Sequence, residues 1–133
     1  MKVEDQYLDV LQNIEFAIVM TYRKYPDMTD YEVLRVLEAL IDSYKAETLG
    51  HNPRDFSPSQ MEVALYQAVR DMCEWRLGRA GPPDATGDLI PAPQPITVDE
   101  IILCLKRLLK SVTKWNKSGG RTGYLTFIVQ YVR

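Results

Sequence analysis

The sequence is poor in the side chains from which most metal and catalytic sites are built. Its 133 residues include one histidine, His51, and two cysteines, Cys73 and Cys104. Structural zinc sites need closely spaced Cys and His ligands, and nucleophilic catalysis needs a nucleophile with a base beside it. Neither pattern occurs, so we expect no metal, no cofactor and no catalytic residue, and we predict that the chain is not an enzyme. We interpret His51 as an exposed loop residue, and both cysteines as small buried apolar side chains without a disulfide.

Long apolar runs are also lacking. No stretch approaches the ~20 apolar residues of a membrane span. The N-terminus reads Met1-Lys2-Val3-Glu4-Asp5, with acidic residues where a secretory signal carries basic ones. We therefore expect a cytoplasmic protein with no membrane partner. A length of 133 residues, with 46% apolar and 26% charged residues, is typical of one globular domain, here spanning 1-133.

Proline and glycine are concentrated in one segment. Residues 78-96 hold five of the eight prolines and three of the seven glycines. Such a composition excludes regular secondary structure. Only 37 residues follow the segment, too few for an independent core without help. We interpret 78-96 as a long irregular crossover within one domain.

Elsewhere the apolar residues recur every three or four positions, which is the spacing of one helix face. The pattern predicts five helices, at about 3-25, 30-49, 58-77, 98-116 and 122-132. Three capping boxes mark helix starts, Thr29 with Glu32, Ser57 with Gln60, and Thr97 with Glu100. The predicted fold is all-α, a five-helix bundle in which a short turn at Pro26 makes the first two helices an antiparallel hairpin. Residues 124-132 also have strand-forming composition, but a lone strand would have no partner.

Apolar side chains lie on more than one side of several predicted helices. One small bundle can hardly cover them all, and exposed apolar patches usually mark interfaces. Because a symmetric dimer is the commonest assembly, we predict a homodimer. The candidate interface residues are Phe16, Met20, Leu103, Phe127 and Tyr131. On the third helix, Ala64 and Ala68 lie one turn apart and predict the close approach of another backbone.

Acidic residues are absent from the last quarter of the chain. After residue 100 there are seven basic and no acidic residues, whereas the first hundred residues hold nine basic and eighteen acidic ones. The candidate basic surface comprises Lys106, Arg107, Lys110, Lys114, Lys117 and Arg121.

This basic surface has two interpretations. One is a nucleic-acid-binding module that also uses the Gly-Gly-Arg turn at 119-121. The other is a surface that pairs with the chain's own acidic residues or those of a second copy. Lysine dominates over arginine, and the overall pI of about 5.4 opposes nucleic-acid binding. We therefore expect a non-enzymatic interaction or scaffold protein acting through helix surfaces as a homo-oligomer. An unidentified protein partner is a further expectation, with no small-molecule substrate and with nucleic-acid binding as the alternative function.

Overall fold

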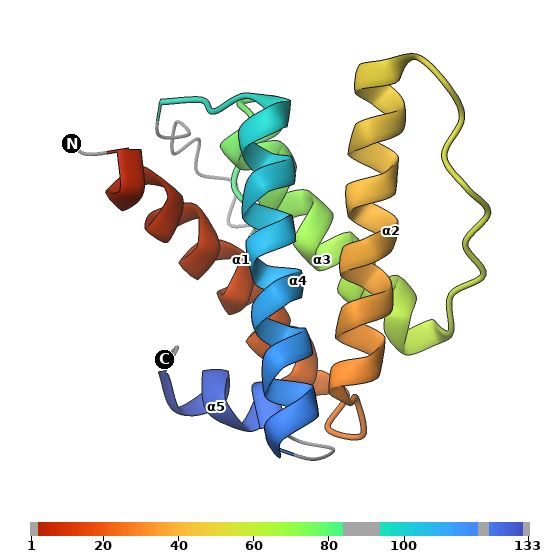
Figure 1. Ribbon diagram of the computed structural model, residues 1–133, viewed down its shortest axis with the longest axis vertical. Helices are drawn as coiled ribbons and strands as arrows, with labels where there is room; N and C mark the ends of the chain where they lie inside the picture. Colours follow the sequence, from red (N-terminus) through yellow and green to blue (C-terminus); the bar gives the residue numbers. More distant parts are fainter. Residues whose placement is uncertain (1–2, 84–93, 120–122, 132–133) are drawn as a thin grey trace.

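The protein is built entirely from helices in the part of the chain that its structure, a computed structural model, describes. The backbone is described for residues 3–83, 94–119 and 123–131, and the side chains for 7–83, 94–115 and 123–130. The helices are α1 (Val3–Lys24), α2 (Asp30–Leu49), α3 (Gln60–Arg76), α4 (Val98–Gly119) and α5 (Gly123–Tyr131) (Figure 1). The all-α prediction is confirmed, and the C-terminal segment is a helix. Most of the predicted 78-96 crossover lies outside the described residues.

Local hydrogen bonds set the helix starts. The Thr29 backbone N–H donates to the Glu32 carboxylate at 2.7 Å, and that of Thr97 donates to Glu100 at 3.0 Å, as the capping boxes predict. The third helix starts at Gln60, after an N-cap at Ser59, two residues later than predicted. Its box joins Ser59 to Glu62, with N–H to oxygen distances of 3.0 and 3.2 Å.

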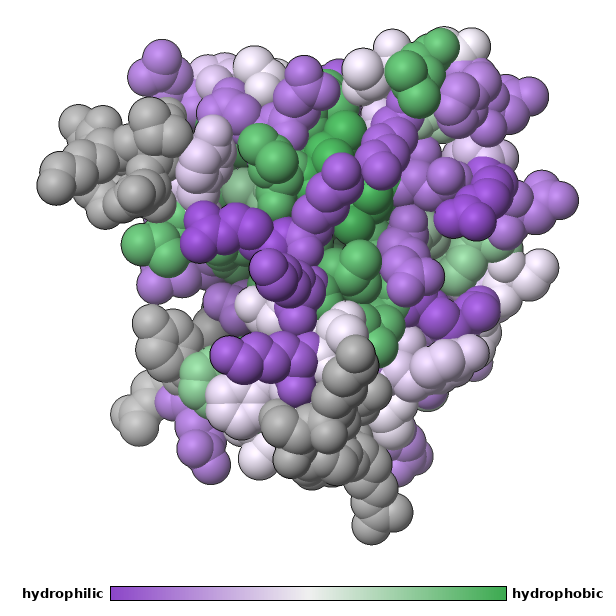
Figure 2. Space-filling model, viewed as in Figure 1, coloured by the Kyte–Doolittle hydropathy of each residue, from purple (hydrophilic) through white to green (hydrophobic). Residues whose placement is uncertain are grey.

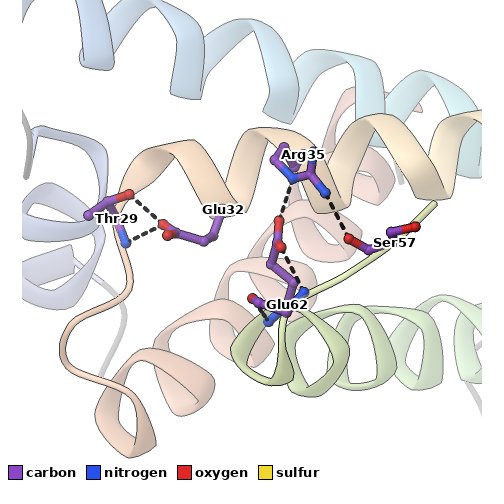
Figure 3. Close-up of polar contacts among 6 residues, drawn as sticks. Thr29, Glu32, Arg35, Ser57 and Glu62 are labelled. Atoms are coloured by element: carbon purple, nitrogen blue, oxygen red, sulfur yellow. Dashed lines mark hydrogen bonds and ion pairs between the residues drawn. The ribbon is translucent and has the colours of Figure 1, made fainter.

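The later box on α3 has a physical reason. Glu62 is nearly buried and accepts a 2.6 Å hydrogen bond from Arg35 Nε of α2 (Figure 3). Arg35 also donates to the backbone carbonyl of Ser57 at 3.3 Å. One carboxylate thus caps α3 and joins it to α2, a tertiary contact that the predicted Ser57 and Gln60 pair does not make.

The helices pack in crossed pairs. The turn after α1 reverses the chain as expected, but α1 and α2 diverge from it (Figure 1). The main partner of α1 is α3, and that of α2 is α4, while α5 packs against α4 and α1. The shared core contains Ile14, Ile18, Val33, Leu37, Leu40, Leu65, Val69, Ile101, Leu105, Tyr124 and Ile128.

The packing of α4 follows its predicted apolar face with one exception. Ile101, Cys104 and Leu105 are buried, as are Leu108 and Val112, but Trp115 is 37% exposed. Trp115 continues this apolar face but lies partly at the surface, where the ring of Phe127 from α5 stacks on it. No described helix combines the length and apolar character that crossing a bilayer requires.

Candidate functional site

A groove of about 530 Å³ runs between α1 and α3. It is lined by Phe16, Ala17, Met20, Thr21, Arg23, Lys24, Tyr25, Ala64, Ala68, Asp71, Met72 and Pro83. Two of the predicted interface residues, Phe16 and Met20, therefore share one site with the predicted small-residue pair, Ala64 and Ala68. We take this α1–α3 groove as the candidate functional site.

The walls of the groove combine projecting and small side chains. Phe16 and Met20 project from α1 with 43% and 42% of their surface exposed. Ala64 and Ala68 of α3 are only partly buried and leave hollows one helical turn apart. The surface can therefore both offer large apolar groups and receive them.

Charged residues lie toward the two ends of the groove. The helices α1 and α3 run antiparallel. Arg76, at the end of α3, accordingly donates hydrogen bonds to Asp9 and Asn13 in the first half of α1. Asp71 of α3 consequently lies toward the Phe16 end. Arg23 and Lys24, at the end of α1, lie toward the start of α3. The groove is thus acidic at one end and basic at the other.

These end charges were missed in reading the sequence. In the sequence alone, a charged residue three positions after Ala68 or after Met20 is only a weak indication that it lies at the end of a binding groove. Only the antiparallel crossing brings the two sets to opposite ends of one groove.

Two other predicted interface residues, Leu103 and Phe127, do not line this groove. Leu103 is 52% exposed on α4. Phe127 of α5 is 38% exposed, and its ring stacks on Trp115 with centroids 4.5 Å apart and planes at 19°. The side chain of Tyr131 lies outside the described residues. The four described residues therefore belong to at least two surfaces, one on α1 and one on α4 and α5.

The basic residues of α4 lie on one exposed surface. Lys106, Arg107, Lys110 and Lys114 are all exposed, while the side chains of Lys117 and Arg121 lie outside the described residues. Figure 2 shows hydrophilic side chains along the line of α4, with apolar surface visible beside them. Lys45 of α2 lies close enough to this surface for its positive charge to lower the pKa of Lys106.

Pairing distinguishes Lys106, Arg107 and Lys110 from four of the arginines elsewhere. Each of Arg35, Arg54, Arg76 and Arg79 forms an ion pair with an Asp or Glu side chain. Within the described part of the chain, no ion pair is formed by Lys106, Arg107 or Lys110. For these three residues, pairing with the acidic residues of a second copy stays a prediction.

Most side chains that could act as an acid, a base or a nucleophile are buried or hydrogen-bonded within the fold. Glu15 is half-buried and accepts a 2.9 Å hydrogen bond from the Tyr124 hydroxyl of α5, and burial raises its pKa. Cys73 and Cys104 are buried free thiols, and burial raises the pKa of Cys104 to about 11, which disfavours the reactive thiolate. His51 is exposed. Among the described residues, no three Asp, Glu, His or Cys side chains are grouped as metal ligands would be.

Comparison of the chain with protein-family models, with curated proteins and with solved structures found no match to any of them. The case for a function therefore rests on the surfaces described above.

Proposed function

We propose that this protein is a non-enzymatic helical interaction protein that assembles as a homodimer through the α1–α3 groove. The observation that carries the proposal is the self-complementary pattern of the groove, with projecting apolar side chains, small-residue hollows and opposite charges at its two ends.

The apolar groups supply the driving force. Burying a Phe or Met side chain fully contributes about 1.5–3 kcal/mol, and a two-fold interface buries each residue twice. In the dimer we propose, Phe16 and Met20 of each copy are buried in the groove of the other. Because Phe16 and Met20 are 43% and 42% exposed in the single chain, each can gain only part of this free energy on dimerisation.

The end charges supply the register. A two-fold axis near the middle of the groove, between Met20 and Ala68, makes two grooves run antiparallel. This places the Arg23 and Lys24 end of each copy against Asp71 of the other. Exposed ion pairs contribute only ~0–1 kcal/mol each, but like charges facing one another would disfavour the opposite register.

Sedimentation velocity over a range of concentrations tests the proposal. The wild-type chain is expected to dimerise, and Phe16→Glu to shift it to monomer because a carboxylate cannot be buried in the apolar interface without a partner. Leu49→Glu is the matched control, since Leu49 is a 70% exposed leucine at the end of α2, outside the groove lining. A wild-type monomer at high micromolar concentration would contradict the dimer. Equal dissociation by both variants would contradict the assignment to the groove.

The cytoplasmic location stays a prediction from the sequence. The absence of enzymatic activity is likewise part of the proposal, supported by the structural roles of Glu15, Cys73 and Cys104.

A further inference from the structure

The basic surface on α4 and α2 lies outside the α1–α3 groove, so the proposed dimer leaves it uncovered. It consists of Lys45, Lys106, Arg107, Lys110 and Lys114, and none of these lines the groove. Residues 101–115 contain no Asp or Glu, so the acidic side chains of α4 are confined to Asp99 and Glu100 in its first turn. Lys45 and Lys106 approach one another from neighbouring helices, an arrangement of like charges that an external anion would relieve.

Apolar side chains flank this surface along α4. Leu103, one turn before Lys106 and Arg107, is 52% exposed. Beyond Lys110 and Lys114, the Trp115 and Phe127 rings form a stacked pair, each ring more than a third exposed. Basic residues beside exposed Leu, Trp and Phe are the composition of helices that lie on membrane surfaces.

We propose that this basic surface docks the protein peripherally onto a membrane containing anionic lipids, with the basic side chains at the headgroups and Leu103, Trp115 and Phe127 entering the interface. The inference does not depend on the dimer. The expectation of no membrane partner rests on the lack of a spanning run, which a peripheral contact does not need.

The residue types favour a lipid surface over a protein or nucleic-acid partner. Four of the five charges are lysines, which are flexible, hydrated point charges suited to a fluid surface without fixed carboxylate positions. A specific protein partner with fixed carboxylates is better matched by the planar fork of arginine. Stacking on nucleobases needs open aromatic faces, and the faces that Trp115 and Phe127 turn toward each other are closed to a base.

The charge distribution would also orient the molecule. The first hundred residues have twice as many acidic as basic residues, whereas α4 presents only basic ones after its first turn. An anionic bilayer attracts the α4 surface and repels the acidic surfaces. This attraction falls off within a Debye length, ~8 Å at physiological salt, so it acts on the side chains nearest the bilayer.

Vesicle co-sedimentation of the full chain tests the inference. The probes are vesicles of phosphatidylcholine alone and of phosphatidylcholine with phosphatidylserine. Binding is expected only to the mixed vesicles and should weaken with added salt. The variant Lys106→Gln/Lys110→Gln should lose roughly fivefold in partitioning for each charge removed. The control Arg54→Gln/Arg79→Gln removes the same net charge from paired arginines elsewhere and should bind nearly as well as the wild type.

Fluorescence supplies a second measurement. The chain has two tryptophans, so Trp75→Phe leaves Trp115 as the only one. Its emission should shift to the blue when mixed vesicles are added and stay unchanged with phosphatidylcholine alone, provided circular dichroism shows wild-type helicity.

Several results would overturn the inference. These are no binding to mixed vesicles, equal binding to both vesicle types, and equal losses in the two double variants. A salt-dependent complex with oligothymidylate at near-physiological salt, in place of vesicle binding, would overturn it and favour a nucleic-acid function.

Discussion

The carboxylate of Asp30, at the start of α2, accepts a hydrogen bond of 2.9 Å from the backbone N–H of Tyr124, 94 positions away in the sequence. Its other oxygen accepts the N–H of Leu125 at 3.1 Å, and the Asp30 side chain is fully buried. These donors belong to the first turn of α5, whose N–H groups have no partner within that helix. Asp30 therefore caps a helix distant in sequence, where the helix dipole also favours a negative charge.

Replacing Asp30 should destabilise the fold. Asp30→Ala leaves two buried N–H groups without an acceptor, which should cost roughly 2–4 kcal/mol of unfolding free energy. Urea denaturation followed by circular dichroism measures the change. Asp27→Ala, which removes an exposed carboxylate from the neighbouring turn, is the control and should stay within about 0.5 kcal/mol. A small loss for Asp30→Ala would mean that α5 contributes little to folding.

Gly123 should tolerate no side chain. A Cβ at this position would lie 2.6 Å from the backbone carbonyl oxygen of Trp115, a contact that only a shift of α5 relieves. Gly123→Ala is therefore expected to destabilise by about 1–3 kcal/mol in the same denaturation experiment. At Gly81 an added Cβ meets nothing within 4 Å, so Gly81→Ala should be neutral within about 0.5 kcal/mol. Equal effects of the two substitutions would contradict the close approach of α4 and α5.

Glu15 should make stability fall as pH rises. Burial raises its pKa above the ordinary 4.5, although the hydrogen bond from Tyr124 opposes the shift. The folded state therefore holds this proton to higher pH than the unfolded state, and the cost of ionising Glu15 appears as pH rises from its ordinary pKa through its folded pKa. Glu62 and Glu100, whose pKa values are lowered, act in the opposite direction.

The Glu15 contribution is isolated by difference. Glu15→Gln keeps an oxygen that can accept the Tyr124 hydroxyl but cannot ionise. Its unfolding free energy, relative to the wild type, should increase as pH rises above 4.5 and level off above the folded pKa. A difference that does not change with pH would show that Glu15 ionises as easily in the folded protein as in the unfolded chain.

The dimer register predicts rescue by charge exchange. Asp71→Lys should weaken association severalfold, because it places a positive charge against Arg23 and Lys24 of the second copy. Arg23→Glu/Lys24→Glu should weaken it as well. The three substitutions together restore opposite charges across the two-fold axis and should recover most of the affinity in sedimentation. Additive weakening, without recovery, would exclude this register even if the dimer itself is confirmed.

The helix positions were predictable because their causes are local. Thr29 with Glu32, and Thr97 with Glu100, cap helices through residues three apart, so the pattern is complete within one short segment. The C-terminal segment was harder, because Tyr124, Ile128 and their neighbours favour strands by composition. It is a helix because one face, including Tyr124, Leu125 and Ile128, is buried against the other helices. Tertiary packing overrides local preference there.

The candidate site was predictable only in its pieces. Phe16 and Met20 were recognisable as apolar residues off the main face of their helix, and Ala64 and Ala68 as a small-residue pair. These residues line one groove only because α1 packs against α3. A short turn between the first two helices had suggested a hairpin, but loop length restricts where a helix goes without deciding which neighbour it packs against.

The sequence by itself determined the helices, their caps and the separation of basic from acidic residues, since each depends on neighbours within a few positions or on composition. Only the tertiary structure decided which carboxylates are buried and which bases are paired. Asp30 resembles an ordinary first-turn acid until α5 is placed over it, and Lys106 resembles Arg79 until the packing supplies Arg79 with Glu47 and leaves Lys106 facing Lys45. Burial and charge pairing are properties of groups brought together from distant parts of the chain, so they arise only when the helices pack.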